Sequence, residues 1–334
     1  MPLISERQQV LDTLRWMSSR GWVLPAFGVE NLTTVEGVLA ATVEQGQLLG
    51  VEDLPVMVAL TNLYPHRSQT VEYTHTRDWR IGLRLFMADL TVLTSPESPY
   101  GRLRVLIHLD HIQPDLDHDL LQWDLAPFSS IMFDASSLTL EENIAATARF
   151  VAERGKEIVV EGACDEIVDA TGQERATLTR PDEVERYFNQ TRCDIVVANL
   201  GTEHRASRKT LAYHGNLARQ MKARIGNRLC LHGTSSVSSN QLGSLFSDGV
   251  IKVNVWTALE RDSSPRLLRE MVKNAARVAG PETTQSLHKA GLLGPAADLV
   301  SDAALAHFTT SHRQAIVFEE MKRITREYLT LWYR

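Results

Sequence analysis

Three histidines and one aspartate follow short apolar segments of the sequence. The segment "RVLIHLDHI" contains Asp110 and His111, His204 follows "DIVVANLG", and His232 ends "RLCLH". Three imidazoles that converge can hold a zinc ion with one open coordination position, which is typical of a catalytic site. A carboxylate beside one ligand can act as a general acid or base. Each histidine alone also fits a hydrogen-bonded loop residue, so the zinc-site hypothesis depends on the fold bringing the three together.

Eight short apolar segments of strand type recur along the chain. They are nearly continuously apolar, as in strands buried on both faces of a sheet. They begin at Trp22, Pro55, Arg104, Ser130, Glu157, Asp194, Arg228 and Val250. Helix-period segments separate most of them, which predicts parallel β/α units, and eight such units predict a closed (β/α)₈ TIM barrel. An open doubly wound sheet is the alternative, although no strand is followed by a GxGxxG or GxxxxGK[ST] loop.

Helix signals between the strands support this order. Thr139 is placed as an N-cap with Glu142 three residues later, and the helical pattern ends at Gly155. Pro181 starts another helix, and "YHGNLARQMKARIG" closes on Gly226. We expect residues 1–260 to form the catalytic barrel. Residues 261–334 should form a C-terminal helical extension that packs on the barrel or on a partner subunit.

The composition limits the class of protein. The chain has 334 residues, with 43% hydrophobic and 23% charged residues, which is ordinary for a soluble globular protein. A net charge of −6 argues against binding to nucleic acid or to an anionic membrane, and no apolar run is long enough to span a bilayer. Cys164, Cys193 and Cys230 are far apart and read as reduced thiols, so we expect a cytoplasmic protein.

Other polar residues accompany the strand ends. Side chains at the C-terminal ends of barrel strands face the active site. Glu161 follows the fifth segment and Asn254 lies in the eighth. His108 shares a strand face with Asp110 because side chains repeat every second residue, so His108 can orient that carboxylate.

Over about residues 1–260 the chain resembles the zinc-dependent class II fructose-bisphosphate and tagatose-bisphosphate aldolases. Six motifs of that family occur in the same order and at similar spacing. The segments "PAFGVEN" and "LIHLDHI" look like the family's "GAFNVNN" and "ALHLDHG". The segments "SIMFDASSLTLEENI" and "GTEHR" look like its "SVMIDGS…EENI" and "GTSHG". The segments "LCLHGTSS" and "VIKVNVWT" look like its "LVLHGGSG" and "VAKINVDT". The resemblance implies that His111, His204 and His232 bind Zn²⁺. It also implies that Asp110 exchanges a proton with the hydroxyl next to the bond that is cleaved.

The implied chemistry suits these residue types. Retro-aldol cleavage leaves electron density beside a carbonyl, and a zinc ion stabilises the resulting enediolate as a Lewis acid. Another divalent metal or an additional monovalent cation is an alternative cofactor. The family also moves the carbon-bound proton with a glutamate on the loop after the fifth strand. Glu174 in "GQE" matches it best and Glu166 is the alternative, while a solvated loop carboxylate explains either residue equally well.

The chain departs from the family around the substrate phosphate. Thr234 and Ser236 replace glycines, Trp256 replaces an aspartate, and Ala163 replaces a glutamate that can contact metal. Arg205 replaces a glycine and so adds a positive charge, while Arg208 replaces a lysine. The alternative for Arg205 is a charge on the solvent-exposed rim with no role in binding. By resemblance the substrate-binding residues are Gly233, Ser235, Asn254, Thr257, Arg205 and Arg208.

These observations predict a zinc-dependent aldolase-type lyase. It should make or break a C–C bond next to the hydroxyketone of a sugar or ketose derivative, phosphorylated or not, other than fructose bisphosphate. A metal-dependent sugar epimerase needs the same enolate and is one alternative; a non-catalytic relative that binds a ligand is the other. The resemblance and the apolar C-terminal stripe of Ile316, Met321, Ile324 and Leu329 predict a homo-oligomer, at least a dimer.

Overall fold

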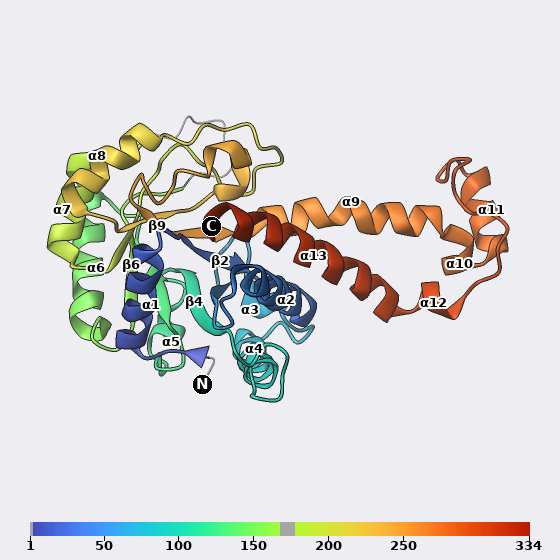
Figure 1. Cartoon of the computed structure of the whole chain (residues 1–334), viewed down its shortest axis with the longest axis horizontal. Coiled ribbons are helices and arrows are strands. Elements are labelled where there is room, and N and C mark those ends of the chain that lie inside the picture. The colour runs from blue at the N-terminus through green and yellow to red at the C-terminus, as the bar shows by residue number, and fades with distance from the viewer. Residues whose placement is uncertain (1–2, 168–177) are drawn as a thin grey trace.

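Parallel strands close into a barrel in the computed structural model, which describes residues 3–167 and 178–334 (Figure 1). The barrel strands are β2 (Leu24–Gly28), β3 (Pro55–Thr61), β4 (Arg104–Ile112), β5 (Ser130–Phe133), β6 (Val159–Ala163), β7 (Ile195–Val197), β8 (Leu229–Leu231) and β9 (Val250–Val255). Neighbours follow the order β4-β3-β2-β9-β8-β7-β6-β5, and pairing of β4 with β5 closes the ring. The predicted (β/α)₈ barrel is therefore confirmed and the open sheet is excluded. A short strand, β1 (Leu3–Ile4), pairs with the start of β4.

Helices surround the barrel in the expected alternation (Figure 1). They are α1 (Arg7–Ser19), α2 (Leu32–Leu49), α3 (Gln69–Glu72), α4 (Trp79–Leu93), α5 (His118–Leu121), α6 (Leu140–Arg154), α7 (Pro181–Thr191) and α8 (Gly215–Ile225). Two 3₁₀ turns follow β8, η1 (Thr234–Ser236) and η2 (Ser239–Gln241). Among the described residues, the structure holds no helix with the length and apolar character that a membrane crossing requires.

The predicted helix boundaries have the expected physical cause. Thr139 caps α6: its hydroxyl accepts from the backbone N–H of Glu142, and the Glu142 carboxylate accepts from the backbone N–H of Thr139. This reciprocal capping box satisfies two amides that lack partners within the helix. Pro181 is the first residue of α7, and Gly226 ends α8 with a positive φ of 76°.

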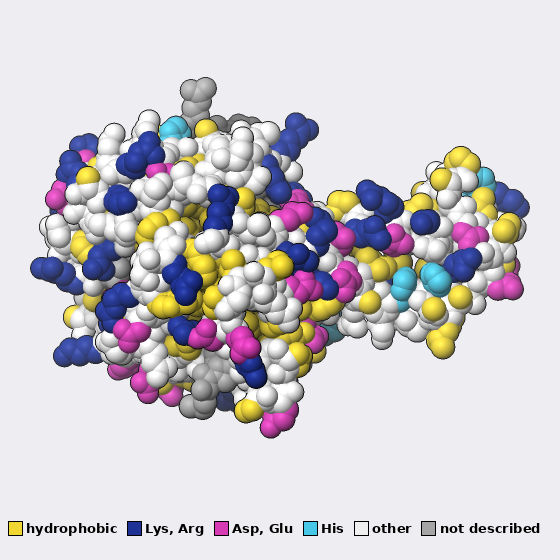
Figure 2. Space-filling model, viewed as in Figure 1, with side chains coloured by type: hydrophobic (Ala, Val, Ile, Leu, Met, Phe, Trp, Pro, Cys, Tyr) yellow, Lys and Arg dark blue, Asp and Glu magenta, His cyan; other side chains and the backbone are white. Residues whose placement is uncertain are grey.

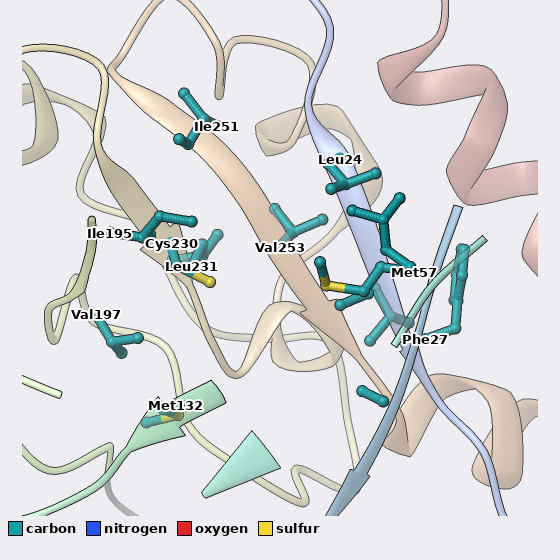
Figure 3. Packing of buried hydrophobic residues seen from close by; sticks show 14 of the residues in the cluster. Leu24, Phe27, Met57, Met132, Ile195, Val197, Cys230, Leu231, Ile251 and Val253 are labelled. Carbon is teal, nitrogen blue, oxygen red and sulfur yellow. The ribbon is translucent and has the colours of Figure 1, made fainter. Parts of the chain in front are cut away.

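Apolar side chains pack on both faces of the barrel strands (Figure 3). Leu24 on β2 and Met57 on β3 are buried inside the barrel, whereas Phe27 on β2 and Val253 on β9 face outward and are buried beneath the helices. Truncating such a side chain typically costs about 2–5 kcal/mol. A packed interior holds the strands in register, so the polar residues at their C-terminal ends occupy fixed positions.

Beyond β9 the chain leaves the barrel and returns to it. The helices here are α9 (Thr257–Lys273), α10 (Ala275–Ala279), α11 (Pro281–Lys289), α12 (Leu305–Phe308) and α13 (Thr310–Trp332). Figure 1 shows α9 and α13 side by side, projecting from the barrel, with α10, α11 and α12 at the far end. We call the projecting part of this hairpin, residues 264–316, the arm.

The second half of α13 packs against α2 of the same chain. Met321, Ile324 and Leu329 are almost fully buried there, and Ile316 is half-buried. Gly37 of α2 permits this contact, because a Cβ atom at that position would lie 2.9 Å from the Cβ atom of Met321. Three of the four residues in the apolar stripe are therefore buried within one protomer.

Candidate active site

The structure brings the three predicted histidines together at one end of the barrel. His111 comes from β4, His204 from the loop after β7, and His232 directly follows β8. One ring nitrogen of each lies within 4.8 Å of those of the other two. The ring centroid of His111 lies 4.9 Å from that of His204 and 5.0 Å from that of His232. Histidines from three separate segments thus converge as a metal site requires.

A bulge in β4 places both Asp110 and His111 in the pocket. In a regular strand these neighbours would face opposite sides of the sheet. The pairing of β4 with β5 shifts register between Leu109 and Ile112, and His111 has a left-handed φ of 50°. A β-bulge redirects a side chain in this way. The sequence shows the two residues side by side, but only the bulge makes both of them available to one site.

The ring of His111 is held from two sides. Its Nδ1 lies 2.7 Å from Asp134 Oδ2, an arrangement in which the ring N–H donates to the carboxylate and Nε2 is left to bind a metal. Burial raises the pKa of Asp134, but the hydrogen bond and charge of His111 outweigh it and lower the pKa to about 2. The Tyr64 ring stacks on His111, with centroids 4.5 Å apart and planes 16° apart.

The other two histidines differ in their surroundings. His232 Nε2 lies 3.1 Å from Oε1 of the buried Glu161, which fixes the ring orientation. Burial lowers the pKa of His204 well below its ordinary value, and the charges of His111 and His232 lower it further. Burial thus favours the neutral imidazole at His204, which is the form that binds metal.

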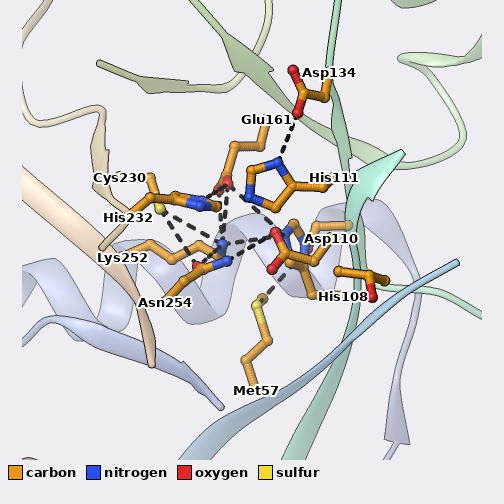
Figure 4. Close-up of polar contacts among 12 residues, drawn as sticks. Met57, His108, Asp110, His111, Asp134, Glu161, Cys230, His232, Lys252 and Asn254 are labelled. Atoms are coloured by element: carbon orange, nitrogen blue, oxygen red, sulfur yellow. Dashed lines mark hydrogen bonds and ion pairs between the residues drawn. The ribbon is translucent and has the colours of Figure 1, made fainter. Parts of the chain in front are cut away.

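Asp110 faces the same pocket and is held as a carboxylate. Asn254 Nδ2 donates to Asp110 Oδ1 at 2.9 Å, and His108 Nε2 lies 3.5 Å from that oxygen (Figure 4). Burial would raise the pKa of Asp110, but the charge of His111 and the contact with His108 hold it well below its usual range. A charged carboxylate beside the histidines can accept a proton. The expected contact between His108 and Asp110 is confirmed.

Lys252 supplies a buried cation at the base of the site. Its Nζ lies 2.9 Å from Glu161 Oε2, 2.6 Å from Asn254 Oδ1 and 3.3 Å from His108 Nε2 (Figure 4). Burial would lower the pKa of Lys252, but Cys230, Glu161 and Asp110 raise it, so the ammonium stays charged. Two further groups of side chains could hold a metal by distance, Glu161 with Cys230 and His232, and His108 with Asp110 and Glu161. The Lys252 ammonium already contacts members of both groups.

Five of the six predicted substrate-binding residues line the pocket, namely Gly233, Ser235, Asn254, Thr257 and Arg205. The pocket encloses about 630 Å³, part of it open to solvent. Gly233 has a φ of 63°, and a Cβ atom there would lie 2.8 Å from the backbone of Glu203. Arg208 is exposed and is absent from the described residues that line the pocket.

Arg205 adopts a backbone conformation that favours glycine, the residue that it replaces in the family motif. Its φ is 54°, in the left-handed region that costs a residue with a Cβ atom roughly 1–2 kcal/mol. Its Nη2 lies 2.9 Å from His66 Nδ1, across the pocket mouth. The site thus combines a backbone conformation suited to glycine with an arginine side chain that lines the pocket.

Neither predicted loop carboxylate is among the described residues that line the pocket. Glu174 lies outside the described residues, and Glu166 is exposed. Asp134 was not predicted from the sequence, although an aspartate directly after an apolar strand meets the criterion used for Asp110. Lys252 was not predicted either, and its signal is a lysine inside the apolar segment "VIKVNV". Glu30 is a third site residue that was not predicted.

The donor set fits a divalent transition metal. Three histidine nitrogens with a free side toward the pocket suit zinc, and carboxylates orient two of the three rings. When bound, such an ion supplies Lewis acidity to a substrate oxygen.

Comparisons with known proteins identify the family of this chain. A sequence profile of the family described as fructose-bisphosphate aldolase class-II matches residues 8–312. The chain is 25% identical over 329 residues to a fructose-bisphosphate aldolase of Staphylococcus epidermidis, covering 94% of this chain and 99% of the relative. It is 24% identical over 246 residues to a sulfofructosephosphate aldolase of Alkalicoccus urumqiensis, covering 72% and 76%.

Solved structures share the fold. A fructose-bisphosphate aldolase from Campylobacter jejuni superposes with a TM-score of 0.76 at 16% identity, covering 99% of this chain and 95% of that one. The YdjI aldolase from Escherichia coli K12 superposes with a TM-score of 0.64 at 18% identity, covering 99% and 97%. With the profile match over nearly the whole chain, these findings show that the chain belongs to the class II fructose-bisphosphate aldolase family and is a divergent aldolase of the lyase class.

Proposed function

We propose that this protein is a zinc-dependent aldolase that makes or breaks a C–C bond next to a hydroxyketone of a sugar or ketose derivative. One observation carries the proposal: three histidines positioned to bind metal share a pocket with Asp110, a carboxylate held in its charged form. Metal ligands and a general base within one cavity are what aldol cleavage requires.

In the cleavage direction, Asp110 accepts the proton of the hydroxyl on the carbon that becomes the aldehyde. The O–H electrons form the new carbonyl, and the electron pair of the C–C bond moves to the carbon beside the ketone. His111, His204 and His232 would hold a zinc ion, which would supply Lewis acidity to an oxygen of the substrate. A proton must then be delivered to the carbon beside the ketone, and Glu174 or Glu166 is proposed for this step.

Asn254 and Lys252 hold the Asp110 carboxylate in its orientation. Asn254 donates to Asp110 Oδ1, which occupies a lone pair of that oxygen and leaves the other carboxylate oxygen available. Lys252 donates to Asn254 Oδ1 and so holds the amide in that orientation. We assign substrate contacts to Gly233, Ser235, Asn254, Thr257 and Arg205, which line the pocket; for Arg208, the exposed position leaves only a contact at the rim.

The substrate should differ from fructose bisphosphate. The sulfofructosephosphate aldolase among the relatives indicates, by its name, that related chains act on more than one sugar derivative. In this chain Trp256 lines the pocket where the family motif has an aspartate, and Arg205 lines it where the motif has a glycine. Both changes reshape the wall that receives the end of the substrate away from the reacting bond.

The test is turnover of a panel of ketose phosphates and free ketoses by the zinc-loaded protein, following aldehyde release and epimer formation together. Release of aldehyde from one member supports the proposal. Epimer formation without aldehyde would replace it with a metal-dependent epimerase. Tight binding of a panel member with neither product would point to a ligand-binding relative.

We also propose that the protein works as a homodimer in the cytoplasm. The arm exposes large apolar side chains, among them Leu268, Leu292, Val300 and Leu305, each at least 65% exposed. Figure 2 shows hydrophobic side chains spread over the surface of this projection. A second copy of the chain would cover them. The cytoplasmic location rests on Cys164, Cys193 and Cys230, which are buried as free thiols.

A further inference from the structure

Trp256 forms a fixed wall of the catalytic pocket. It lines the same cavity as Asp110 and the three histidines. Its indole N–H donates to Glu30 Oε1 at 2.7 Å. On its other side it lies against the backbone of Gly28, where a Cβ atom would be 2.9 Å from the Cβ atom of Trp256 and 3.2 Å from its ring. Gly28 therefore makes the room that the indole occupies.

Glu30 is the group that anchors this wall. It is only 7% exposed, and three side-chain donors from two parts of the chain converge on its carboxylate. Besides Trp256, the Arg67 guanidinium binds both carboxylate oxygens, and Gln69 Nε2 donates to Oε1 at 3.2 Å. The backbone N–H of Glu30 donates to Thr34 Oγ1 at 2.9 Å, which ties the residue to the start of α2. A carboxylate held this way keeps its partners in place.

The same contacts occupy Arg67. This residue also lines the pocket, and its Nε lies 3.1 Å from Glu30 Oε1 while its Nη2 binds the other oxygen. A two-point contact between guanidinium and carboxylate uses the geometry by which arginine would otherwise bind a phosphate or sulfonate. The pocket thus has an arginine on its wall whose charge is already compensated.

We propose that Glu30 is a positioning residue that determines substrate specificity. It holds Trp256 as an apolar wall and neutralises Arg67, so this side of the pocket receives an uncharged, C–H-rich part of the substrate in place of an anionic group. The inference rests on the proposed function for its setting, since the pocket is taken as the place where the sugar derivative binds. It names the class of substrate: a hydroxyketone with no anion on the Trp256 side.

Binding of inorganic sulfate tests this without turnover. Isothermal titration of the zinc-loaded protein with sulfate compares the wild type with Glu30→Gln, which keeps an acceptor for Trp256 but removes the charge that neutralises Arg67. We expect Glu30→Gln to bind sulfate roughly tenfold more tightly, the effect of about one charge-assisted hydrogen bond. Glu52→Gln is the matched control, because it removes the same charge from an exposed ion pair with Arg102 and should leave sulfate affinity unchanged.

The double variant Glu30→Gln/Arg67→Met removes both charges. It should bind sulfate as weakly as the wild type, because in the wild type Arg67 is already neutralised. A loss of affinity in this variant would show that Arg67 binds anions despite Glu30, and an unchanged affinity in Glu30→Gln would show that Glu30 does not control it. Either result overturns the inference. Should Glu30→Gln fail to fold, the double variant, which removes both charges of the ion pair, still tests the inference, because a loss of sulfate affinity in it overturns the inference.

Turnover then separates this inference from the proposed function. If the panel yields a substrate, Glu30→Gln should raise the KM of that substrate several-fold. It should lower the KM of an analogue that carries an anion on the Trp256 side, with kcat changed less than KM. A panel with no turnover would defeat the proposed function while the sulfate result still stands. Equal KM changes for both analogues would defeat the specificity role.

Discussion

The ammonium of Lys252 lies 2.6 Å from the side-chain oxygen of Asn254, two residues later on β9. Lysine has only donors, so the amide oxygen of Asn254 must face it. The amide nitrogen consequently faces Asp110 and donates to it at 2.9 Å. A buried lysine thus determines the orientation of a neighbour and, through it, the hydrogen bonding of the proposed base.

Replacing Lys252 with methionine should destabilise the fold. The variant leaves Glu161 as a fully buried charge without its cation, which costs about 3–5 kcal/mol. The free energy of unfolding in urea measures the loss. Lys252→Met/Glu161→Gln should recover most of it, because both charges are then gone. If the free energy of unfolding of Lys252→Met lies within about 1 kcal/mol of the wild-type value, Glu161 has found another partner and this account is wrong.

Replacing His204 with alanine should remove most of the bound zinc. Only two of the three histidine nitrogens would remain, and zinc sites of this kind need three protein ligands. Metal content after dialysis, by elemental analysis, is the measurement. His288→Ala is the control, since His288 lies on α11 of the arm. A His204→Ala protein with a full complement of zinc would rule out this ligand set.

Asp110→Ala should lose turnover and keep its zinc. General acid–base groups contribute on the order of 10²–10⁴ in rate, and Asp110 is not one of the three ligands proposed here. Steady-state kinetics on the substrate found by the panel, together with zinc content, separates the two effects. Near-wild-type kcat in the variant would make Asp110 a structural residue.

Fructose 1,6-bisphosphate should be a poor substrate. The indole of Trp256 fills space beside Gly28, and Arg67 is paired with Glu30, so a phosphate finds little to bind on this wall. We expect kcat/KM below roughly 10⁴ M⁻¹s⁻¹, under the ordinary range for enzymes. Trp256→Asp combined with Arg205→Gly should raise it. A wild-type value above that limit would mark an ordinary fructose-bisphosphate aldolase, and no gain in the double variant would place specificity in the loop after β6.

The arm should mediate dimer formation. Sedimentation velocity at micromolar concentration is expected to show a dimer. Leu268→Glu/Val300→Glu, two exposed arm positions, should shift it to monomer because a charge would be buried at the interface. Leu48→Glu is the control, because Leu48 is 71% exposed on α2, away from the arm. A wild-type monomer at these concentrations is the contrary result.

Several features of this protein were determined by local sequence alone. The apolar segments and the capping signals at Thr139, Pro181 and Gly226 each act within a few residues, so the order of strands and helices could be predicted. Asp110, His111, His204 and His232 could be chosen because parallel strands present their C-terminal ends at one rim. The type of reaction was inferred from the resemblance of the motifs to a known family, because residue types and spacing alone do not specify it.

Only the tertiary structure decided how the site is built. The bulge at His111 depends on pairing between β4 and β5, so the sequence could not show that His111 turns inward. Lys252 acquires its role from Glu161, which is 91 residues away, and Glu30 acquires its role from Trp256, 226 residues away. Such contacts carry no local signature, because they exist only once the barrel closes. The apolar stripe of α13 shows the same limit: its periodicity determined that one face is buried, and only the packing on α2 decided that its own chain covers it.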